Sequence, residues 1–274
     1  MLTDKPNTDE LEADKFTKVA FRGAKFQLKV IPGLALLAFV ALLAFWQLGS
    51  VQGWVPSIVL PAPLEIGQAL WQLIISGELW QHLGASLQRL VLGWSLGTVC
   101  GLFIGALVGL TSVGRAIGVP FISAFFAIPK IALLPLFIIW FGIGEPSKVA
   151  TIAFGVFFPT VIYTYSGIDM VPRNLIQMGL SFNLKTQSIV SHIIFPGALP
   201  NILAGCRISA SIGIILLVAA EMIGAEFGVG ALILAAGNLY QIEQLLAGVM
   251  ILSMLGLTVS SLITRIERRL LRWR

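Results

Sequence analysis

Long apolar runs without charged residues recur along the chain. The hydrocarbon core of a bilayer is about 30 Å thick, and an α-helix needs about 20 residues to cross it. A transmembrane barrel would instead show many strands of about 10 residues with alternating polarity, and the sequence has no such alternation. The pattern therefore predicts an all-α membrane protein with six transmembrane helices. The predicted spans cover about 31–50, 86–110, 116–141, 149–168, 197–222 and 244–263.

The composition excludes a soluble domain. Apolar residues make up 57% of the 274 residues and charged residues only 11%, with a mean hydropathy of +0.92. Soluble domains contain about 45–50% apolar and about 25% charged residues. The formal net charge of +5 does not indicate nucleic-acid binding, because the basic residues are not gathered on one soluble face.

Most basic residues lie on one side of the predicted membrane. Of the 18 Lys and Arg residues, six lie in the first 29 residues and five in the C-terminal tail. Three more follow the second and fourth predicted spans, on the same side of the membrane as the termini: Arg115, Arg173 and Lys185. Cytoplasmic loops retain Lys and Arg. We therefore expect both termini to be cytoplasmic, with an N-terminal tail over residues 1–29 and a transmembrane domain over residues 30–274.

Glycine recurs at every fourth position of the second span. Residues four apart share one face of a helix, so these glycines form a strip along which another helix can approach closely. The strip indicates either tight static packing or a surface on which one helix slides against another. The members of this glycine strip are Gly93, Gly97, Gly101, Gly105 and Gly109.

Two prolines interrupt the third span, and each of them removes a helix hydrogen bond. Broken helices at membrane depth often mark a transport path. Lys130 follows the first break, and Arg207 lies within the fifth span. A cation inside the membrane costs about 2.5–3.5 kcal/mol on insertion scales, so we expect it to be functional or paired. The candidate translocation path comprises Pro129, Lys130, Pro135, Arg207 and Glu221.

Two interpretations of these cations remain open. Two cations at a similar depth suggest a path for an anion. Alternatively, each cation is held by carbonyls freed at the proline breaks or by a carboxylate, or its long side chain snorkels to the interface. Glu221 is a poor partner for Arg207 within one helix, because their separation of 14 positions corresponds to about 21 Å.

Two connections between spans have helical patterns of their own. Residues 61–82 begin with two prolines and continue with apolar residues at helical spacing. This pattern predicts either a helix on the outer membrane interface or a packed loop helix. The loop over about 169–196 is moderately polar and helical in composition. Since a connection between helices needs only a few residues, we expect this cytoplasmic loop to contact a partner.

The sequence lacks the motifs with which the chain would supply its own energy or catalysis. The nucleotide-binding motif G-x-x-x-x-G-K-[ST] does not occur. The two histidines fall on opposite faces of the predicted membrane, and no carboxylate cluster lies within the spans. We expect no catalytic residues, no metal site, and an energy source outside this chain. The alternatives are an ion-gradient-driven secondary transporter or channel subunit, which would need intramembrane carboxylates, and a membrane assembly or anchoring subunit.

Several segments resemble a known family. From about residue 57 to the end, the chain resembles the inner-membrane permease subunit of binding-protein-dependent ABC importers, in the branch that takes up nitrate, bicarbonate, taurine and other sulfonates. The resemblance implies a type I ABC importer permease fold, with a core over about residues 80–264. The matching segments are IVLPAPLEIGQAL at 58–70, LWQHLGASLQRLVLGWSLG at 79–97, AIPKIALLPLFIIWFGIGEPSK at 127–148, FPGALPNILAGCRISASIG at 195–213 and AAEMIGAEFGVG at 219–230.

The resemblance also implies a coupling loop that docks into an ATPase subunit. In the family this loop carries Glu-Ala-Ala, then a glycine, then Leu-Pro. This chain departs from the pattern, with asparagine at the glycine position and glycine at the second alanine position. Asparagine tolerates the left-handed backbone that ends a helix, whereas a glycine inside the helix costs about 1 kcal/mol relative to alanine. The matched or bounding residues are Gln177, Met178, Gly179, Phe182, Asn183, Pro196 and Pro200.

The assembly that the resemblance implies has two permease copies, two cytoplasmic ATPase subunits and a periplasmic or lipid-anchored substrate-binding protein. It would lie in the bacterial inner membrane, in contact with lipid and without nucleic acid. ATP and Mg²⁺ would bind the ATPase, with no cofactor in this chain. Alternating access would carry a small anion such as nitrate, bicarbonate, taurine or another sulfonate, with the movement absorbed at the glycine strip and the proline breaks.

Overall fold

The computed structural model describes residues 33–272, and over that range the chain forms helices and turns without any β-strand. The chain divides into two compact units, one ending at Trp46 and one beginning at Gln47. The first predicted span forms α2 (Leu34–Val51), which crosses this boundary. The expected N-terminal tail over residues 1–29 lies outside the described residues.

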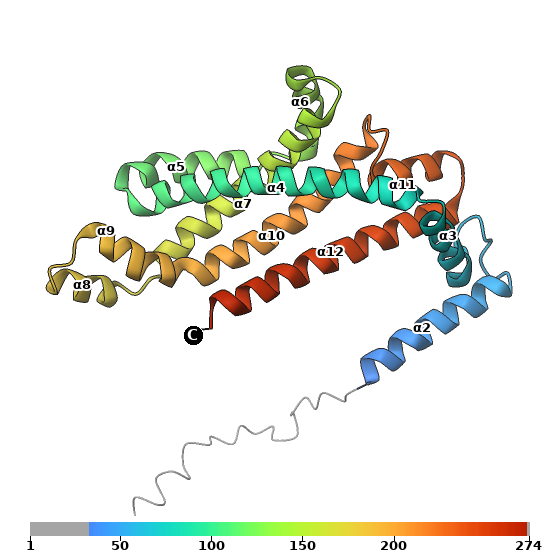
Figure 1. Cartoon of the computed structure of the whole chain (residues 1–274), viewed down its shortest axis with the longest axis horizontal. Coiled ribbons are helices and arrows are strands. Elements are labelled where there is room, and N and C mark those ends of the chain that lie inside the picture. The colour runs from blue at the N-terminus through green and yellow to red at the C-terminus, as the bar shows by residue number, and fades with distance from the viewer. Residues whose placement is uncertain (1–32, 273–274) are drawn as a thin grey trace, which may run out of the picture. The chain divides into compact units, whose positions relative to one another are not determined.

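Four long apolar helices make up most of the second unit (Figure 1). They are α4 (Glu78–Leu110), α7 (Glu145–Asp169), α10 (Phe195–Met222) and α12 (Ile242–Leu270). Together with α2 they give five helices in the described part of the chain that are long and apolar enough to cross a membrane, or six spans when a bent helix pair is counted as one. The prediction of an all-α membrane protein is confirmed.

The bent pair is the third predicted span, and it is not one continuous helix. α5 (Ser112–Phe126) is followed by a 3-10 turn, η1 (Lys130–Leu133), and by α6 (Leu134–Phe141). The two halves meet at an angle of 88°. The break falls at Pro129, whereas Pro135 lies in the first turn of α6, where a missing N–H removes no helix hydrogen bond.

The interpretation of residues 61–82 as one helix is wrong. α3 (Pro63–Ile75) begins at a proline, and the Glu65 carboxylate accepts a hydrogen bond from the N–H of Ala62 at 2.8 Å. Gly77 then adopts a left-handed φ of +82°, so the remaining residues belong to α4. α3 buries Ile66, Ala69 and Leu73 and contacts α12 and α4. These contacts favour the packed loop helix over a helix lying on the membrane interface.

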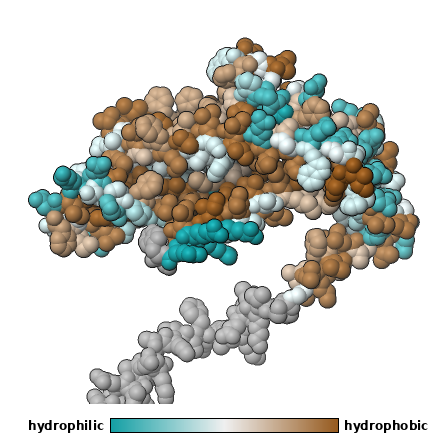
Figure 2. Space-filling model, viewed as in Figure 1, coloured by the Kyte–Doolittle hydropathy of each residue, from teal (hydrophilic) through white to brown (hydrophobic). Residues whose placement is uncertain are grey.

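Shorter helices cap the long ones. α8 (Arg173–Ser181) and α9 (Thr186–Ile189) lie at one end, and α3 and α11 (Val229–Asn238) lie at the other (Figure 1). α9 continues through a π-helical segment, η2 (Val190–Ile194), into α10. The second half of the predicted 169–196 loop is therefore part of a span. Hydrophobic residues cover most of the visible face between the two ends, as a membrane-embedded surface requires (Figure 2).

The glycine strip of α4 lies directly on α7. A Cβ added at Gly97 would lie 2.4 Å from the carbonyl oxygen of Ala153, and one added at Gly105 would lie 2.6 Å from the Cβ of Thr164. Successive glycines meet successive turns of α7, ending at Gly109 against Ile168. The two helices therefore run in the same direction, at a separation that only glycine allows.

Hydroxyl groups on α7 face this apolar contact without leaving unsatisfied donors. The side chains of Thr151, Thr160 and Thr164 are buried, and each hydroxyl donates to the carbonyl four residues earlier at 2.7–2.9 Å. Bonding of this kind satisfies a hydroxyl inside a membrane helix without a partner on the neighbouring helix. α7 can therefore present a smooth surface to the glycine strip.

Alanine at Gly97 should destabilise the protein, because its Cβ would meet backbone atoms of α7. Overpacking of this kind costs about 1–3 kcal/mol. Gly84 lies in the same helix with nothing within 4 Å of an added Cβ, so Gly84→Ala is the matched control and should gain about 0.5–1 kcal/mol from helix propensity. Thermal unfolding of the purified protein in detergent measures both. Equal melting temperatures for the two variants would contradict the close contact.

Candidate functional site

A buried arginine joins three helices. Arg89 of α4 is 4% exposed. Its guanidinium donates two hydrogen bonds to the Glu145 carboxylate, at 2.6 and 2.7 Å, and one to Glu221 at 2.8 Å. Glu145 begins α7 and Glu221 lies in the last turn of α10. A bidentate arginine–carboxylate pair fixes direction as well as distance, so Arg89 holds the ends of α7 and α10 against α4.

The partners of Glu221 come from α4 and from the start of α11. Its side chain is fully buried. The Ser86 hydroxyl lies 2.7 Å from one carboxylate oxygen, and the backbone N–H of Gly230 donates to the other at 2.9 Å. A Cβ at Gly228 would lie 2.5 Å from the Glu221 carboxyl carbon, and its φ is +147°. Glycine is therefore required for the chain before α11 to approach this carboxylate.

Two more polar side chains complete the site. The N–H of Gly228 donates to Nδ1 of His82 at 3.0 Å, and Lys148 lies 3.4 Å from Glu145. Two cations thus face two carboxylates, as buried charges require. We call this set the Arg89 cluster. Its members are His82, Ser86, Arg89, Glu145, Lys148 and Glu221.

From the sequence we expect Glu221 on the translocation path, and no pattern assigns a role to Arg89. The structure places Glu221 in the Arg89 cluster, with no bond to Arg207. One sequence signal pointed to Arg89: it lies four residues before Gly93, on the helix face that carries the glycine strip. A charged residue that continues a tightly packed face needs a partner on the neighbouring helix.

Lys130 lies at the break of the third span. Its ammonium donates a hydrogen bond to the carbonyl of Phe126, the last residue of α5. The same group lies 4.5 Å from the Phe126 ring centroid and 5.4 Å from that of Phe158 on α7. The contacts match the alternative in which a carbonyl freed at the break holds the cation. They leave part of its hydrogen-bonding capacity unused, since an ammonium has three donors.

Arg207 has a carboxylate partner. Its guanidinium is ion-paired with Glu267 of α12, and the two side chains are 38% and 24% exposed. The predicted sixth span ended at residue 263, whereas α12 continues to Leu270, and this longer helix brings Glu267 to Arg207. Within the described residues, Lys130, Arg207 and Glu221 have three separate sets of partners.

The turn after α8 has the left-handed backbone that is expected where asparagine replaces the glycine of the coupling loop. Asn183 has a φ of +58°. Its N–H donates to the carbonyl of Leu180 at 2.9 Å, and the N–H of Leu184 donates to that of Gly179 at 3.1 Å. This pair of bonds is a Schellman motif, which usually places glycine at the left-handed position. The asparagine therefore ends the helix as glycine would.

One face of α8 packs and the rest is open. Gly179 is buried, and a Cβ there would lie 3.0 Å from Ile193 and 3.3 Å from Ile189. Met178 and Phe182 are 52% and 75% exposed, and Gln177 is exposed as well. Pro196 lies in the first turn of α10 and Pro200 lies inside it. The loop thus presents apolar side chains outward from a well-defined helix.

Comparison with known proteins identifies relatives over most of the chain. Residues 97–272 match the protein family described as binding-protein-dependent transport system inner membrane component. The aliphatic sulfonates transport permease protein SsuC of Bacillus subtilis is 39% identical over 87% of each chain, and the taurine transport system permease protein TauC of Escherichia coli is 32% identical over 85% of this chain and 86% of its own. The inward-facing MetNI methionine ABC transporter has a similar fold, with a TM-score of 0.61 at 21% identity over 70% of this chain and 95% of that chain.

Replacing Arg89 with glutamine should destabilise the protein strongly, because Glu221 would remain buried without its charge partner. Breaking a buried ion pair costs about 3–5 kcal/mol. The matched control is Arg115→Gln, whose pair with Asp169 is 46% and 43% exposed and should be worth about 0–1 kcal/mol. Thermal unfolding in detergent compares the two.

A second variant separates charge from packing. Adding Glu221→Gln to Arg89→Gln should recover part of the lost stability, because residues in one network are coupled by about 0.5–3 kcal/mol. If the losses of the two single variants simply added, the ionic role of the Arg89 cluster would be refuted.

Proposed function

Because the chain belongs to the family of binding-protein-dependent transport system inner membrane components, we propose that it forms the membrane path for a small aliphatic sulfonate. As a member of this family it is an inner-membrane permease subunit of an ABC importer, which works with an ATPase and a substrate-binding protein. It is a transport subunit rather than an enzyme. Family membership thus favours ATP-driven import over an ion-gradient-driven transporter or channel.

The substrate class follows from the relatives and from Lys130. Relatives named for aliphatic sulfonates and taurine are 32–39% identical to this chain, which favours a sulfonate over nitrate or bicarbonate. A sulfonate carries a permanent negative charge and several acceptor oxygens. The Lys130 ammonium has donors beyond the one bound to the Phe126 carbonyl. This partly satisfied cation beside a broken helix is the observation that most supports an anionic substrate.

We assign α8 as the coupling helix that docks into the ATPase. Met178 of α8 and Phe182, the residue that follows this helix, are exposed, and both residue types are enriched at protein interfaces. The Schellman turn at Asn183 gives the helix a fixed end. ATP and Mg²⁺ would bind the ATPase, so that nucleotide-driven movement reaches the permease through α8.

The complete transporter would contain two copies of this chain and two ATPase subunits, with the binding protein at the outer face. In this arrangement both chain termini and α8 are cytoplasmic, and the Arg89 cluster lies toward the outside. Alternating access would move the path between the two copies from an inward-open to an outward-open state. Arg207 belongs to the cytoplasmic half of α10, where Glu267 pairs with it.

Transport measurements test this function directly. Proteoliposomes that contain the permease, its ATPase and its binding protein should accumulate labelled taurine or an alkanesulfonate only with ATP, and an excess of nitrate should not compete. Uptake that persists without ATP, or a purified permease that retains no ATPase, would refute the ABC assignment. ATP-dependent uptake of nitrate alone would refute the substrate class.

Removing the Lys130 charge should impair uptake. Lys130→Met deletes a charge-assisted hydrogen bond worth about 1.5–3 kcal/mol, so sulfonate uptake should fall about tenfold or more. Lys130→Arg keeps the charge and should retain most of the activity. Initial uptake rates in the same proteoliposomes give the comparison, with melting temperatures as a check on folding. Wild-type uptake by Lys130→Met would remove Lys130 from the path.

Removing an apolar anchor of α8 should uncouple the ATPase. Phe182→Ser should lower co-purification of the ATPase about thirtyfold, since hot-spot side chains contribute about 2 kcal/mol or more. Leu239 is similarly exposed, at 67%, and lies at the opposite end of the unit, after α11, so Leu239→Ser is the control. Equal ATPase recovery from both variants would refute the assignment of α8.

A further inference from the structure

A pocket of about 510 Å³ lies where three membrane helices end. α4 ends at Leu110, α5 begins at Ser112, and α7 ends at Asp169. All three are candidate membrane spans or parts of one, so their shared end marks the boundary between the hydrocarbon core and the polar surface. The first residue of α8 closes the pocket on the other side.

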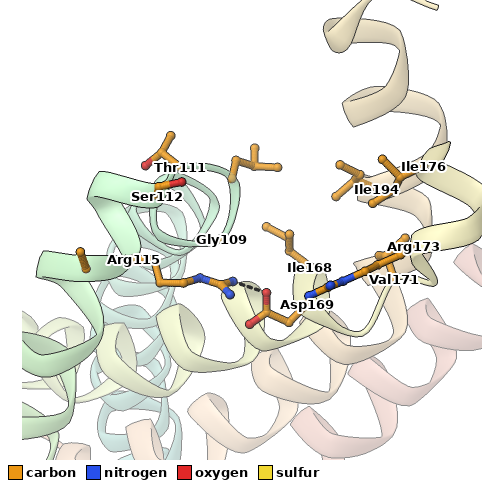
Figure 3. Close-up of a pocket in the computed structure, with 12 residues that line it drawn as sticks. Gly109, Thr111, Ser112, Arg115, Ile168, Asp169, Val171, Arg173, Ile176 and Ile194 are labelled. Carbon is orange, nitrogen blue, oxygen red and sulfur yellow. Dashed lines mark hydrogen bonds and ion pairs between the residues drawn. The ribbon is translucent and has the colours of Figure 1, made fainter. Parts of the chain in front are cut away.

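Two arginines reach into this pocket from opposite sides. Arg115 of α5 is ion-paired with Asp169, and Arg173 of α8 extends toward the same carboxylate (Figure 3). Within the described part of the chain, no hydrogen bond or ion pair satisfies the Arg173 guanidinium. One carboxylate cannot neutralise two guanidinium groups. The pocket therefore has an excess of positive charge that an anion would balance.

The remaining lining is suited to an amphiphile. Ile168, Val171, Ile176 and Ile194 form apolar walls beside the arginines. Ser112, the first residue of α5, also lines the pocket. Arginine binds phosphate oxygens in a bidentate manner, and basic pockets between membrane helices bind the head groups of anionic lipids. A free anion would use the arginines but would leave the apolar walls without a partner.

We propose that this pocket binds a phosphate group, supplied by the head group of an anionic phospholipid, between Arg115 and Arg173. The lipid would then contact α8 at its first residue, beside the surface that the proposed function assigns to the ATPase. The binding itself does not depend on that assignment. Inorganic phosphate offers the same chemistry without the acyl chains, and the experiment below distinguishes the two sources.

Native mass spectrometry of the purified full-length protein tests the site. The protein in detergent is mixed with phosphatidylglycerol or phosphatidylcholine, and the retained lipid is counted. Wild-type protein should retain phosphatidylglycerol preferentially. Arg173→Gln should weaken that binding about fivefold, the factor that corresponds to one basic residue near a membrane surface. Arg272→Gln removes the same charge at an exposed position beyond α12 and should change binding less than twofold.

A gain-of-binding variant keeps the test independent of folding. Asp169→Asn releases Arg115 from its ion pair and should strengthen phosphatidylglycerol binding about fivefold. A misfolded protein would not gain affinity. If Arg173→Gln and Asp169→Asn both bind phosphatidylglycerol as the wild type does, the site is refuted.

Other outcomes identify other occupants. If millimolar inorganic phosphate binds in an Arg173-dependent way while the protein shows no preference for phosphatidylglycerol, a lipid source is refuted. If Arg272→Gln loses as much lipid as Arg173→Gln, binding reflects net charge and the pocket is refuted. If Arg173→Gln loses the ATPase but keeps its lipid, the pocket is a protein contact and the proposal fails, whereas sulfonate transport can still be correct.

Discussion

The close contact between α4 and α7 sets the register on which the other features depend. Each glycine of the strip meets one turn of α7, and an added Cβ at any of the five would lie within 2.7 Å of an α7 atom. Because both helices run in the same direction, one register holds along the whole contact. It brings Arg89 to Glu145 before the strip begins, and Arg115 to Asp169 after the strip ends.

The two ends of this contact use charge differently. At one end, Arg89 is buried and has carboxylates from two helices, so removing it leaves an uncompensated charge. At the other, Arg115 and Asp169 are more than 40% exposed, and such pairs contribute little to stability. One end is therefore fixed by buried electrostatics, while the other can exchange partners at low cost. α8 begins beside the exchangeable end.

The sequence allowed prediction of features that depend on neighbouring residues. The number and approximate positions of the spans, the glycine face and the break at Pro129 follow from local chemistry, and the structure contains each. The left-handed turn at Asn183 was expected from the resemblance, because asparagine stands at the glycine position of the coupling loop, and the structure has it. The partners of Arg89 and Arg207 did not follow, because Glu221 and Glu267 are distant in sequence and meet them only through helix register. Helix ends were also missed where a charged residue continues a helix, as Glu78 does in α4.

The Arg89 cluster bears on how such a chain can move. Sliding α4 along α7 by one turn would separate Arg89 from both oxygens of Glu145, which it now holds at 2.6 and 2.7 Å. The geometry thus favours static packing of the glycine strip over a sliding surface. Segments with few buried contacts open most easily. η1 has no buried residue, and α8 has Gly179 alone. We therefore expect a conformational cycle to change the α5–α6 break and the α8 end, with α4 and α7 moving as one body.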